Sequence, residues 1–219
     1  MIETKKAIIW DWNGTLLDDT AICIESMNEL LEVRNLELLN HAKYSEIFTF
    51  PVRDYYLHAG FDLEAEAFEG PAMDFIRRYH KRLPEAALHE GVPEILACLK
   101  KKGFSQSVLS AMEHDSLLDS MRQKGVAHFF DHITGISDHY AHSKLEIGEM
   151  LMQELVYPAE QVLIVGDTLH DLEVGEGLGI EVLLIANGHQ SYARLRARTR
   201  HVLHNLGEFR RLIDETLCV

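Results

Sequence analysis

An aspartate at the end of an apolar segment opens a short polar turn, Asp11-Trp12-Asn13-Gly14-Thr15. The four residues Ala7-Ile8-Ile9-Trp10 before it favour a buried strand. A carboxylate that leaves such a strand beside a glycine is well placed for chemistry, because the backbone can approach a ligand closely there. Side chains two positions apart point the same way along an extended chain, so Asn13 should lie beside Asp11. Phosphoryl-transfer chemistry would require a second acid at that position, and the chain has an amide.

Short apolar segments alternate with segments of helical period along much of the chain. We predict strands at 7–12, 106–111, 132–136, 161–165 and 181–186, and helices at 93–102, 116–124, 144–155 and 169–178. Alternation of this kind predicts an α/β fold, with a parallel sheet and helices on both of its faces.

One connection is too long for a single crossover, since about 90 residues separate the first predicted strand from the second. Residues 17–88 show helical patterns nearly throughout, with amphipathic stretches at 21–33 and 63–83. We therefore expect two domains. An α/β core would comprise residues 1–16 and 89–219, and a helical cap would comprise residues 17–88, with hinges near 16–19 and 88–91.

The composition is that of a soluble globular protein, with 47% apolar and 26% charged residues among 219. A net charge of −14 opposes extended contact with nucleic acid, and we expect no nucleic-acid or membrane partner. No apolar run approaches the roughly 18 residues of a membrane span, and the first is too short for a signal peptide. Cys23, Cys98 and Cys218 are far apart, which indicates neither a disulfide framework nor a zinc site. A reducing, cytoplasmic setting fits best.

Polar side chains follow several predicted strands, at the sheet edge where ligands collect in open α/β folds. They are Asp11, Asn13, Ser110, Lys144 and the carboxylates of Gly166-Asp167-Thr168-Leu169-His170-Asp171, with Ala111 beside Ser110. A carboxylate can attack a phosphate monoester covalently, but both groups are anionic. Mg²⁺ held by Asp11 and Asp167 would cancel that repulsion, with the Lys144 ammonium as a second positive charge. Ser110 could donate to a phosphoryl oxygen.

Four motifs, taken in order, resemble those of the haloacid dehalogenase (HAD) superfamily. They are Asp11-Trp12-Asn13-Gly14-Thr15-Leu16, Val108-Leu109-Ser110, Lys144 and Gly166-Asp167-Thr168-Leu169-His170-Asp171. The motifs span nearly the whole chain, and the helical insert follows the first of them. The insert and the Gly-Asp-Thr-x-x-Asp ending look most like the phosphoglycolate phosphatase group. The resemblance implies a Rossmann-like parallel sheet core with an inserted helical cap.

The resemblance also implies a Mg²⁺-dependent phosphatase that acts on a small phosphorylated metabolite, with phosphoglycolate as the first example to test. Asp11 would be the nucleophile that forms an aspartyl-phosphate. Asp11, Asp167 and the backbone carbonyl of Asn13 would bind Mg²⁺, and Asp171 would orient a metal-bound water or Lys144. The residues that would hold the transferring phosphoryl group are Thr15, Ser110, Ala111 and Lys144.

Position 13 departs from the pattern of that group, where an aspartic acid protonates the leaving alcohol and later activates water. Asn13 can do neither, and general acid–base catalysis contributes about 10²–10⁴ in rate. Three explanations stay open: a slow phosphatase or one that favours good leaving groups, a non-catalytic phospholigand-binding protein on the same fold, or a substitution made in the laboratory. His170 and His114 are candidates for a substitute acid, or else surface and helix-start residues.

A few charged residues outside the motifs remain to be placed. Arg53, in the predicted cap, could pair with a carboxylate or second phosphate of the substrate, or could simply start a helix. We expect Asp18 and Asp19 to cap the following helix. His189 and Gln190, beyond the fifth strand, are expected only to shape a loop beside the crevice.

Overall fold

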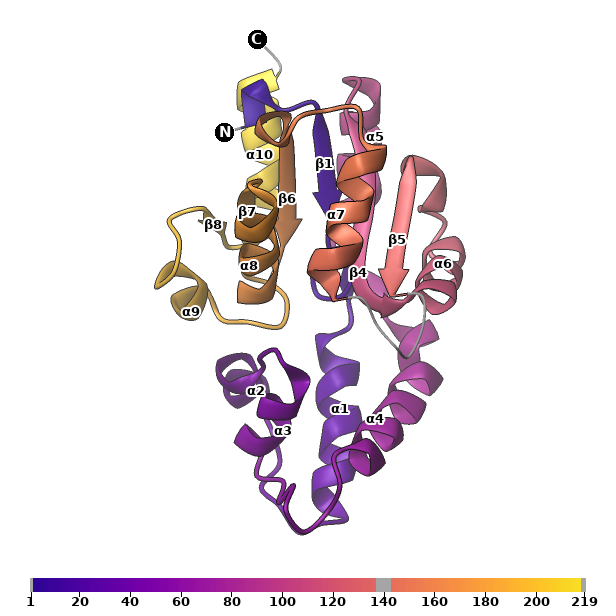
Figure 1. Ribbon diagram of the computed structural model, residues 1–219, viewed down its shortest axis with the longest axis vertical. Coiled ribbons are helices and arrows are strands. Elements are labelled where there is room, and N and C mark those ends of the chain that lie inside the picture. Colours follow the sequence, from indigo (N-terminus) through magenta and orange to yellow (C-terminus); the bar gives the residue numbers. More distant parts are fainter. Residues whose placement is uncertain (1, 137–142, 218–219) are drawn as a thin grey trace.

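A six-stranded parallel sheet forms the centre of the larger part of the molecule (Figure 1). The computed structural model describes residues 2–136 and 143–217. The strand order is β5-β4-β1-β6-β7-β8, and every neighbouring pair is parallel. The strands are β1 (Ala7–Trp10), β4 (Ser105–Glu113), β5 (His132–Ile136), β6 (Val162–Gly166), β7 (Glu181–Ile185) and β8 (Val202–Leu203). The predicted α/β fold with a parallel sheet is confirmed.

Strand β1 lies between β4 and β6, and all four of its side chains are buried. Ile8 and Trp10 belong to one hydrophobic cluster, whereas Ala7 and Ile9 belong to the other. Side chains alternate between the faces of a strand, so each cluster covers one face of the sheet. A sheet covered on both faces requires the nearly unbroken apolar run that the sequence has here.

Helices cover both faces of the sheet, as the two clusters require. Residues of α5 (Val92–Lys101), α6 (His114–Gln123) and α10 (Leu206–Leu217) contribute to the cluster that contains Trp10. Residues of α7 (Lys144–Glu154) and α8 (Leu169–Leu178) contribute to the other cluster, and α9 (Tyr192–Arg196) adds Leu195 to it. Short 3₁₀ turns complete the described elements: η1 (Ile2–Thr4), η2 (Leu83–Glu85), η3 (Ala127–Phe129) and η4 (Ala159–Gln161).

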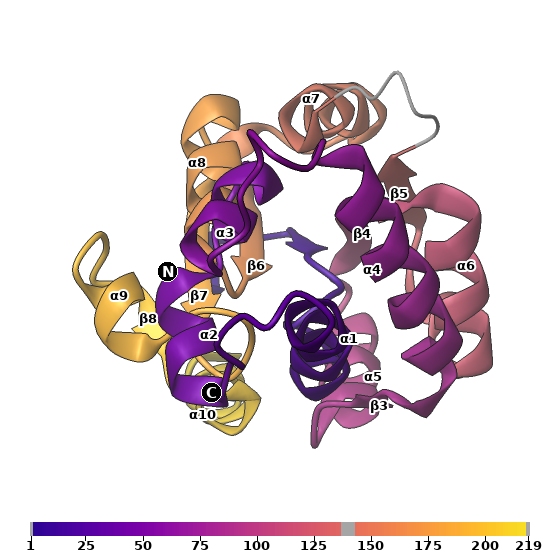
Figure 2. The same cartoon turned by 90° about the horizontal axis from the view of Figure 1, so that it is seen from below.

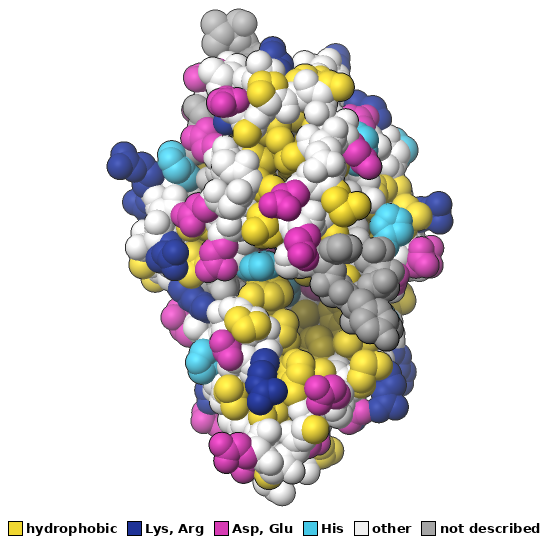
Figure 3. Space-filling view, viewed as in Figure 1, with side chains coloured by type: hydrophobic (Ala, Val, Ile, Leu, Met, Phe, Trp, Pro, Cys, Tyr) yellow, Lys and Arg dark blue, Asp and Glu magenta, His cyan; other side chains and the backbone are white. Residues whose placement is uncertain are grey.

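A helical unit stands across the carboxyl edge of the sheet (Figures 1 and 2). It contains α1 (Thr20–Glu32), α2 (His41–Ile47), α3 (Val52–His58) and α4 (Glu69–Arg82). The chain enters it through β2 (Leu17–Asp18) and leaves through β3 (Ala87–Leu88), and these two strands pair antiparallel. We propose this ribbon as the boundary between a cap of residues 17–88 and a core of residues 1–16 and 89–219. Figure 3 shows a hollow between the two parts, where hydrophobic side chains gather.

Three details of the predicted elements are wrong. Strand β4 continues to Glu113, beyond the predicted end at residue 111, with a register shift against β5 between Leu109 and Glu113. Helix α4 begins at Glu69 rather than at residue 63, and Gly70 and Pro71 lie in its first turn, where a proline is tolerated because the first N–H groups have no helical partner. The two-residue strands β2, β3 and β8 were not predicted, because they are too short to show a period.

Within residues 2–136 and 143–217, none of the helices is long and apolar enough to cross a bilayer.

Candidate active site

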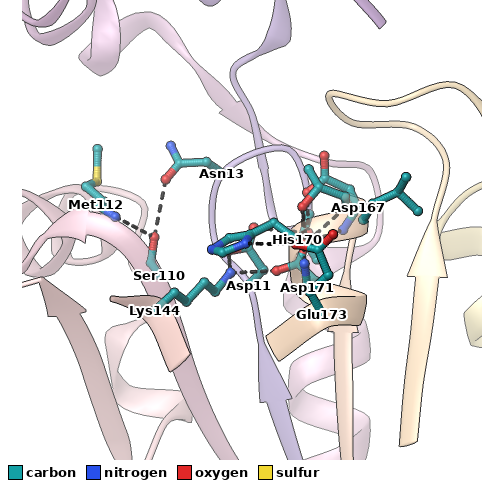
Figure 4. A network of polar contacts seen from close by, with 12 residues as sticks. Asp11, Asn13, Ser110, Met112, Lys144, Asp167, His170, Asp171 and Glu173 are labelled. Carbon is teal, nitrogen blue, oxygen red and sulfur yellow. Dashed lines mark hydrogen bonds and ion pairs between the residues drawn. The ribbon is translucent and has the colours of Figure 1, made fainter. Parts of the chain in front are cut away.

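The ammonium group of Lys144 joins two carboxylates that lie on different elements (Figure 4). Its Nζ donates to Asp11 Oδ1 at 2.5 Å and to Asp171 Oδ1 at 2.6 Å. Asp11 follows β1, Lys144 is the first residue of α7, and Asp171 lies in the first turn of α8. All three side chains are buried. The structure therefore brings together Lys144 and two carboxylates that lie 133 and 27 positions from it in the sequence.

A lysine at the start of a helix faces the positive end of the helix dipole, which is unfavourable for a cation. Helix α7 is fixed there by a capping box between Ser143 and Glu146. The two carboxylates compensate the buried ammonium, because burial by itself lowers the pKa of Lys144 but the charges of Asp11 and Asp171 raise it above its ordinary value. Lys144 is thus a permanent cation in a buried site.

Asp171 has every carboxylate oxygen engaged. Its Oδ2 accepts from the backbone N–H groups of Asp167 and Thr168 and from Thr168 Oγ1, in the capping box of α8. Burial alone would raise its pKa, but the charge and hydrogen bond of Lys144, with the bonds from Thr168, hold the pKa below its ordinary value. Asp171 is therefore a fixed anion that aims Lys144 at Asp11.

Asp11 and Asp167 face each other across a shared hydroxyl. Thr15 Oγ1 lies 2.9 Å from Asp167 Oδ1 and 3.3 Å from Asp11 Oδ2, and the backbone N–H of His189 donates to Asp167 Oδ2 at 2.6 Å. Two glycines make room for Asp167. A Cβ on Gly14 or on Gly188 would collide with the Asp167 carboxylate, and Gly14 also has a φ of 74°.

The site has more negative charge than its cations balance. Burial raises the pKa of Asp11 to about 7, and Asp171 and Asp167 add to the increase although Lys144 opposes it. Burial likewise raises the pKa of Asp167 to about 6, against the effect of His189. Oxygens of Asp11, Asp167 and Asp171 lie within 4.8 Å of one another. This cluster could bind a divalent metal, and its all-oxygen donor set suits a hard cation.

Asn13 and Ser110 meet at the side of this cluster, from the first turn and from β4. Ser110 Oγ donates to Asn13 Oδ1 at 3.4 Å and accepts from the backbone N–H of Met112 at 3.1 Å. Ala111 follows Ser110 at the irregular part of β4 and is half-buried. The sequence-predicted residues at positions 11, 15, 144, 167 and 171 thus lie in one connected network. Asn13 and Ser110 form a neighbouring pair, which Asp19 and His189 link to that network.

The remaining candidates lie outside that network. Arg53 is exposed on α3 of the cap, and the contacts of the described residues include no hydrogen bond or ion pair from it. His170 stacks on Phe50 with the ring centroids 4.5 Å apart, and burial followed by the charge of Lys144 lowers its pKa. His114 is the first residue of α6, in agreement with the helix-start interpretation.

Asp19 and His189 are the residues whose importance the sequence did not indicate. The expectation that Asp19 caps α1 is wrong, since its side chain makes no capping bond and instead accepts from the backbone N–H of Gly14 at 2.9 Å. His189 Nε2 lies 3.4 Å from Asp19 Oδ1, and His189 Nδ1 lies 2.9 Å from the hydroxyl of Tyr44 in the cap. Burial alone would lower the pKa of His189, but the charge of Asp19 raises it to about 9.

His189 is therefore a buried cation beside Asp19 and Asp167, and it does more than shape a loop. Its place after a strand, in Gly188-His189-Gln190, was the signal available in the sequence. His89 is also buried, with Nε2 3.0 Å from the Gly14 carbonyl and Nδ1 3.0 Å from Asn187 Nδ2. Nothing in the sequence around His89 indicates that contact.

Known proteins that resemble this chain agree with the geometry. The family model described as haloacid dehalogenase-like hydrolase matches residues 8–185. An N-acetylmuramic acid 6-phosphate phosphatase of Pseudomonas putida is 26% identical over 219 residues, which cover 97% of this chain and 98% of the relative.

Two solved structures share the whole fold. A haloacid dehalogenase-like hydrolase from Streptococcus pneumoniae has a TM-score of 0.81 at 20% identity, covering 96% of this chain and 99% of the other. A predicted phosphoglycolate phosphatase from Haemophilus somnus has a TM-score of 0.74 at 18% identity, covering 95% and 98%. The expected Rossmann-like sheet with a helical cap is confirmed by these neighbours.

Replacing Gly188 by alanine should weaken divalent-metal binding about 10- to 100-fold, as changes next to metal ligands commonly do. The added methyl group would push against the Asp167 carboxylate and the Gly14 carbonyl. Isothermal titration calorimetry with Mg²⁺ measures the effect. Gly70→Ala is the matched control, because its Cβ would meet only Glu66 at an ordinary 3.8 Å. Equal affinities in the two variants would contradict the prediction.

Divalent-metal affinity should also fall as the pH decreases below about 7. The pKa of Asp11 is raised to about 7, so below that pH a proton must leave the carboxylate before a cation can bind. One displaced proton predicts a loss of about tenfold in affinity between pH 7 and 6 and little change above pH 7, and the loss should be steeper below pH 6, where Asp167 is also protonated. Titrations in buffers of different ionisation enthalpy count the released protons. An affinity that stays constant from pH 5 to 8 would refute this.

Proposed function

Because this chain belongs to the haloacid dehalogenase-like hydrolase family, we propose that it is a phosphatase that hydrolyses a small phosphorylated metabolite through Asp11. The observation that carries this proposal is the buried contact of Lys144 with both Asp11 and Asp171. This contact places a cation against the carboxylate at the carboxyl end of the central strand, where ligands of parallel sheets collect. The names of the similar proteins support small phosphorylated molecules as substrates.

Asp11 acts as the nucleophile in this proposal. An oxygen of its carboxylate attacks phosphorus, the bond from phosphorus to the leaving oxygen breaks, and an aspartyl-phosphate forms. Water then cleaves the aspartyl-phosphate, which releases inorganic phosphate and restores Asp11. Lys144 lowers the pKa of Asp11 from the value that burial alone would give, and it offsets part of the repulsion between Asp11 and the anionic substrate.

The carboxylates of Asp11 and Asp167 and the backbone carbonyl of Asn13 would hold Mg²⁺. When bound, Mg²⁺ supplies the positive charge that the site lacks for an anionic nucleophile and an anionic substrate. Asp171 is the anion that positions Lys144, because its own oxygens are already satisfied.

Thr15, Ser110, Ala111 and Lys144 hold the transferring phosphoryl group in this proposal. Ser110 already accepts a hydrogen bond from Met112, which orients its own hydrogen away from that residue. Its bond to Asn13 is long, at 3.4 Å, so a phosphoryl oxygen can take that hydrogen at little cost. Donors fixed in this way stabilise the charge on phosphoryl oxygens in the transition state.

Asn13 has no acidic proton to give to the leaving alcohol, which costs about 10²–10⁴ in rate for a leaving group that needs one. Aryl and acyl phosphates should therefore be the fastest substrates. The same observation favours a second candidate, a phospholigand-binding protein that uses this site without turnover. Phosphoglycolate is the first metabolite to test, with Arg53 of the cap as the partner for its carboxylate.

The two cysteines that the structure describes, Cys23 and Cys98, are both free thiols. Cys218 lies outside the described residues. The free thiols support a reducing, cytoplasmic setting for this activity.

Asp11→Asn should lower kcat/KM for an aryl phosphate with Mg²⁺ at least about 10³-fold, since an amide cannot attack phosphorus. Release of inorganic phosphate under steady-state conditions measures this. Asp214→Asn is the control, because Asp214 is exposed on α10 and pairs only with Arg210 among its described contacts. Turnover of the Asp11→Asn variant at the parent rate would contradict the nucleophile assignment. Micromolar binding of phosphate by the parent with no turnover would favour the binding protein.

Arg53→Ala should raise KM for phosphoglycolate about tenfold and leave KM for an aryl phosphate without a carboxylate unchanged, because a charged hydrogen bond contributes about 1.5–3 kcal/mol. Initial-rate kinetics on both substrates test the role of Arg53. The matched control is Arg77→Ala, which removes an exposed arginine of α4 that pairs with Asp74. A KM that rises equally for both esters would show that Arg53 does not recognise the carboxylate.

A further inference from the structure

The side-chain amide of Asn13 belongs to a closed ring of hydrogen bonds. Asn13 Nδ2 donates to Asp19 Oδ2 at 2.8 Å and to the Tyr79 hydroxyl at 2.7 Å. The Tyr79 hydroxyl in turn donates to Asp19 Oδ2 at 2.6 Å. Both amide hydrogens are used on this side, so the carbonyl oxygen Oδ1 points the other way, where Ser110 Oγ lies 3.4 Å from it. Reversing the amide would set its oxygen against the Asp19 carboxylate, acceptor against acceptor.

Asp19 cannot turn away from this ring. Its carboxylate is 1% exposed, and its second oxygen accepts from the backbone N–H of Gly14 at 2.9 Å. His189 Nε2 lies 3.4 Å from that same oxygen. Both oxygens of the Asp19 carboxylate are therefore held in place, and Oδ2 faces Asn13 Nδ2 as an acceptor. A second acceptor at the position of Asn13 Nδ2 would be repelled.

Tyr79 brings the cap into the ring. It lies on α4, is buried, and packs parallel to Phe75 with ring centroids 5.9 Å apart. Asn13 belongs to the turn after β1, 66 positions away in the chain. The ring therefore forms only when α4 lies against the turn that carries Asp11, and the orientation of the amide depends on the position of the cap.

We propose that Asp19 and Tyr79 are positioning residues that fix the Asn13 carbonyl oxygen toward the phosphoryl-binding side, and that they select an amide over an acid at position 13. The identity of that side as phosphoryl-binding rests on the proposed function. Asn13 Oδ1 then serves as a fixed hydrogen-bond acceptor for the hydrolytic water. A carboxylate at position 13 would meet the Asp19 carboxylate and would leave Tyr79 without its donor.

The acid can therefore be restored at position 13 only if position 19 becomes a donor. Asn13→Asp alone should cleave an alkyl phosphate no faster than the parent. Asn13→Asp combined with Asp19→Asn exchanges donor and acceptor within the ring, and it should be at least about tenfold faster than either single variant, within the range of general acid catalysis. A double variant no faster than Asn13→Asp overturns the selection of the amide by Asp19.

Thermal unfolding separates this inference from the proposed function, because it needs no turnover. Each single variant should lower the unfolding midpoint by about 3 °C, and the double variant should lower it by clearly less than the sum. If the midpoints of the variants are coupled in this way but the protein hydrolyses no phosphate ester, the result would support the hydrogen-bonded ring and overturn the proposed phosphatase function. Additive midpoints would overturn the ring, whatever the rates.

Tyr79→Phe tests the contribution of the cap. Removing the hydroxyl should lower kcat for alkyl phosphates about tenfold with KM for phosphate esters unchanged, because the amide loses one of its two anchors. Tyr55→Phe is the matched control, since the buried Tyr55 hydroxyl has no hydrogen-bond partner among the described residues and α3 carries it in the same cap. Equal kcat values for the two variants would overturn the role of Tyr79.

Discussion

The buried ammonium of Lys144 is the constraint on which the rest of the site depends. An unpaired charge in this position would be very costly, and it is tolerated because Asp11 and Asp171 lie within hydrogen-bond distance. That pairing requires the end of β1, the start of α7 and the first turn of α8 to meet at one point. The strand order of the sheet satisfies this requirement, because β1 lies between β4 and β6. Helices α7 and α8, which follow β5 and β6, start at the carboxyl edge where β1 ends (Figure 1). The capping boxes of α7 and α8 then fix the helix ends that carry Lys144 and Asp171.

A second buried ion pair, between Asp19 and His189, lies on the cap side of the same turn. The charges that gather there are carboxylates at positions 11, 19, 167 and 171 and cations at positions 144 and 189. Burial raises the pKa values of Asp11 and Asp167, and the neighbouring carboxylates add to the increase. The excess of negative charge is the physical reason to expect a divalent cation beside them. The second pair also links the cap to the core, because Tyr44 contacts His189 and Tyr79 contacts Asp19.

Much of the fold follows from local patterns. The apolar run of β1 predicted a buried strand, and the structure places it inside the sheet. The span of α8 was predicted to the residue, since a threonine cap and a following glycine mark its ends. The end of β4 was wrong because the strand passes through its irregularity rather than stopping there. The division into core and cap was suggested by the spacing of the strands, and the β2–β3 ribbon at the neck supports it.

The sequence by itself determined the chemistry that is available: Asp11, Lys144, Asp167 and Asp171 stand at predicted strand and helix ends, and parallel strands bring such ends to one edge. Tertiary structure alone decided how position 13 is used. Asn13 meets Tyr79 across 66 residues, and Tyr44 meets His189 across 145. The periodicity of the sequence does not indicate contacts of this kind, because they arise from the packing of the cap on the core. The missing acid is visible in the sequence, but only the packed structure supplies a reason, which is that Asp19 and Tyr79 require a donor there.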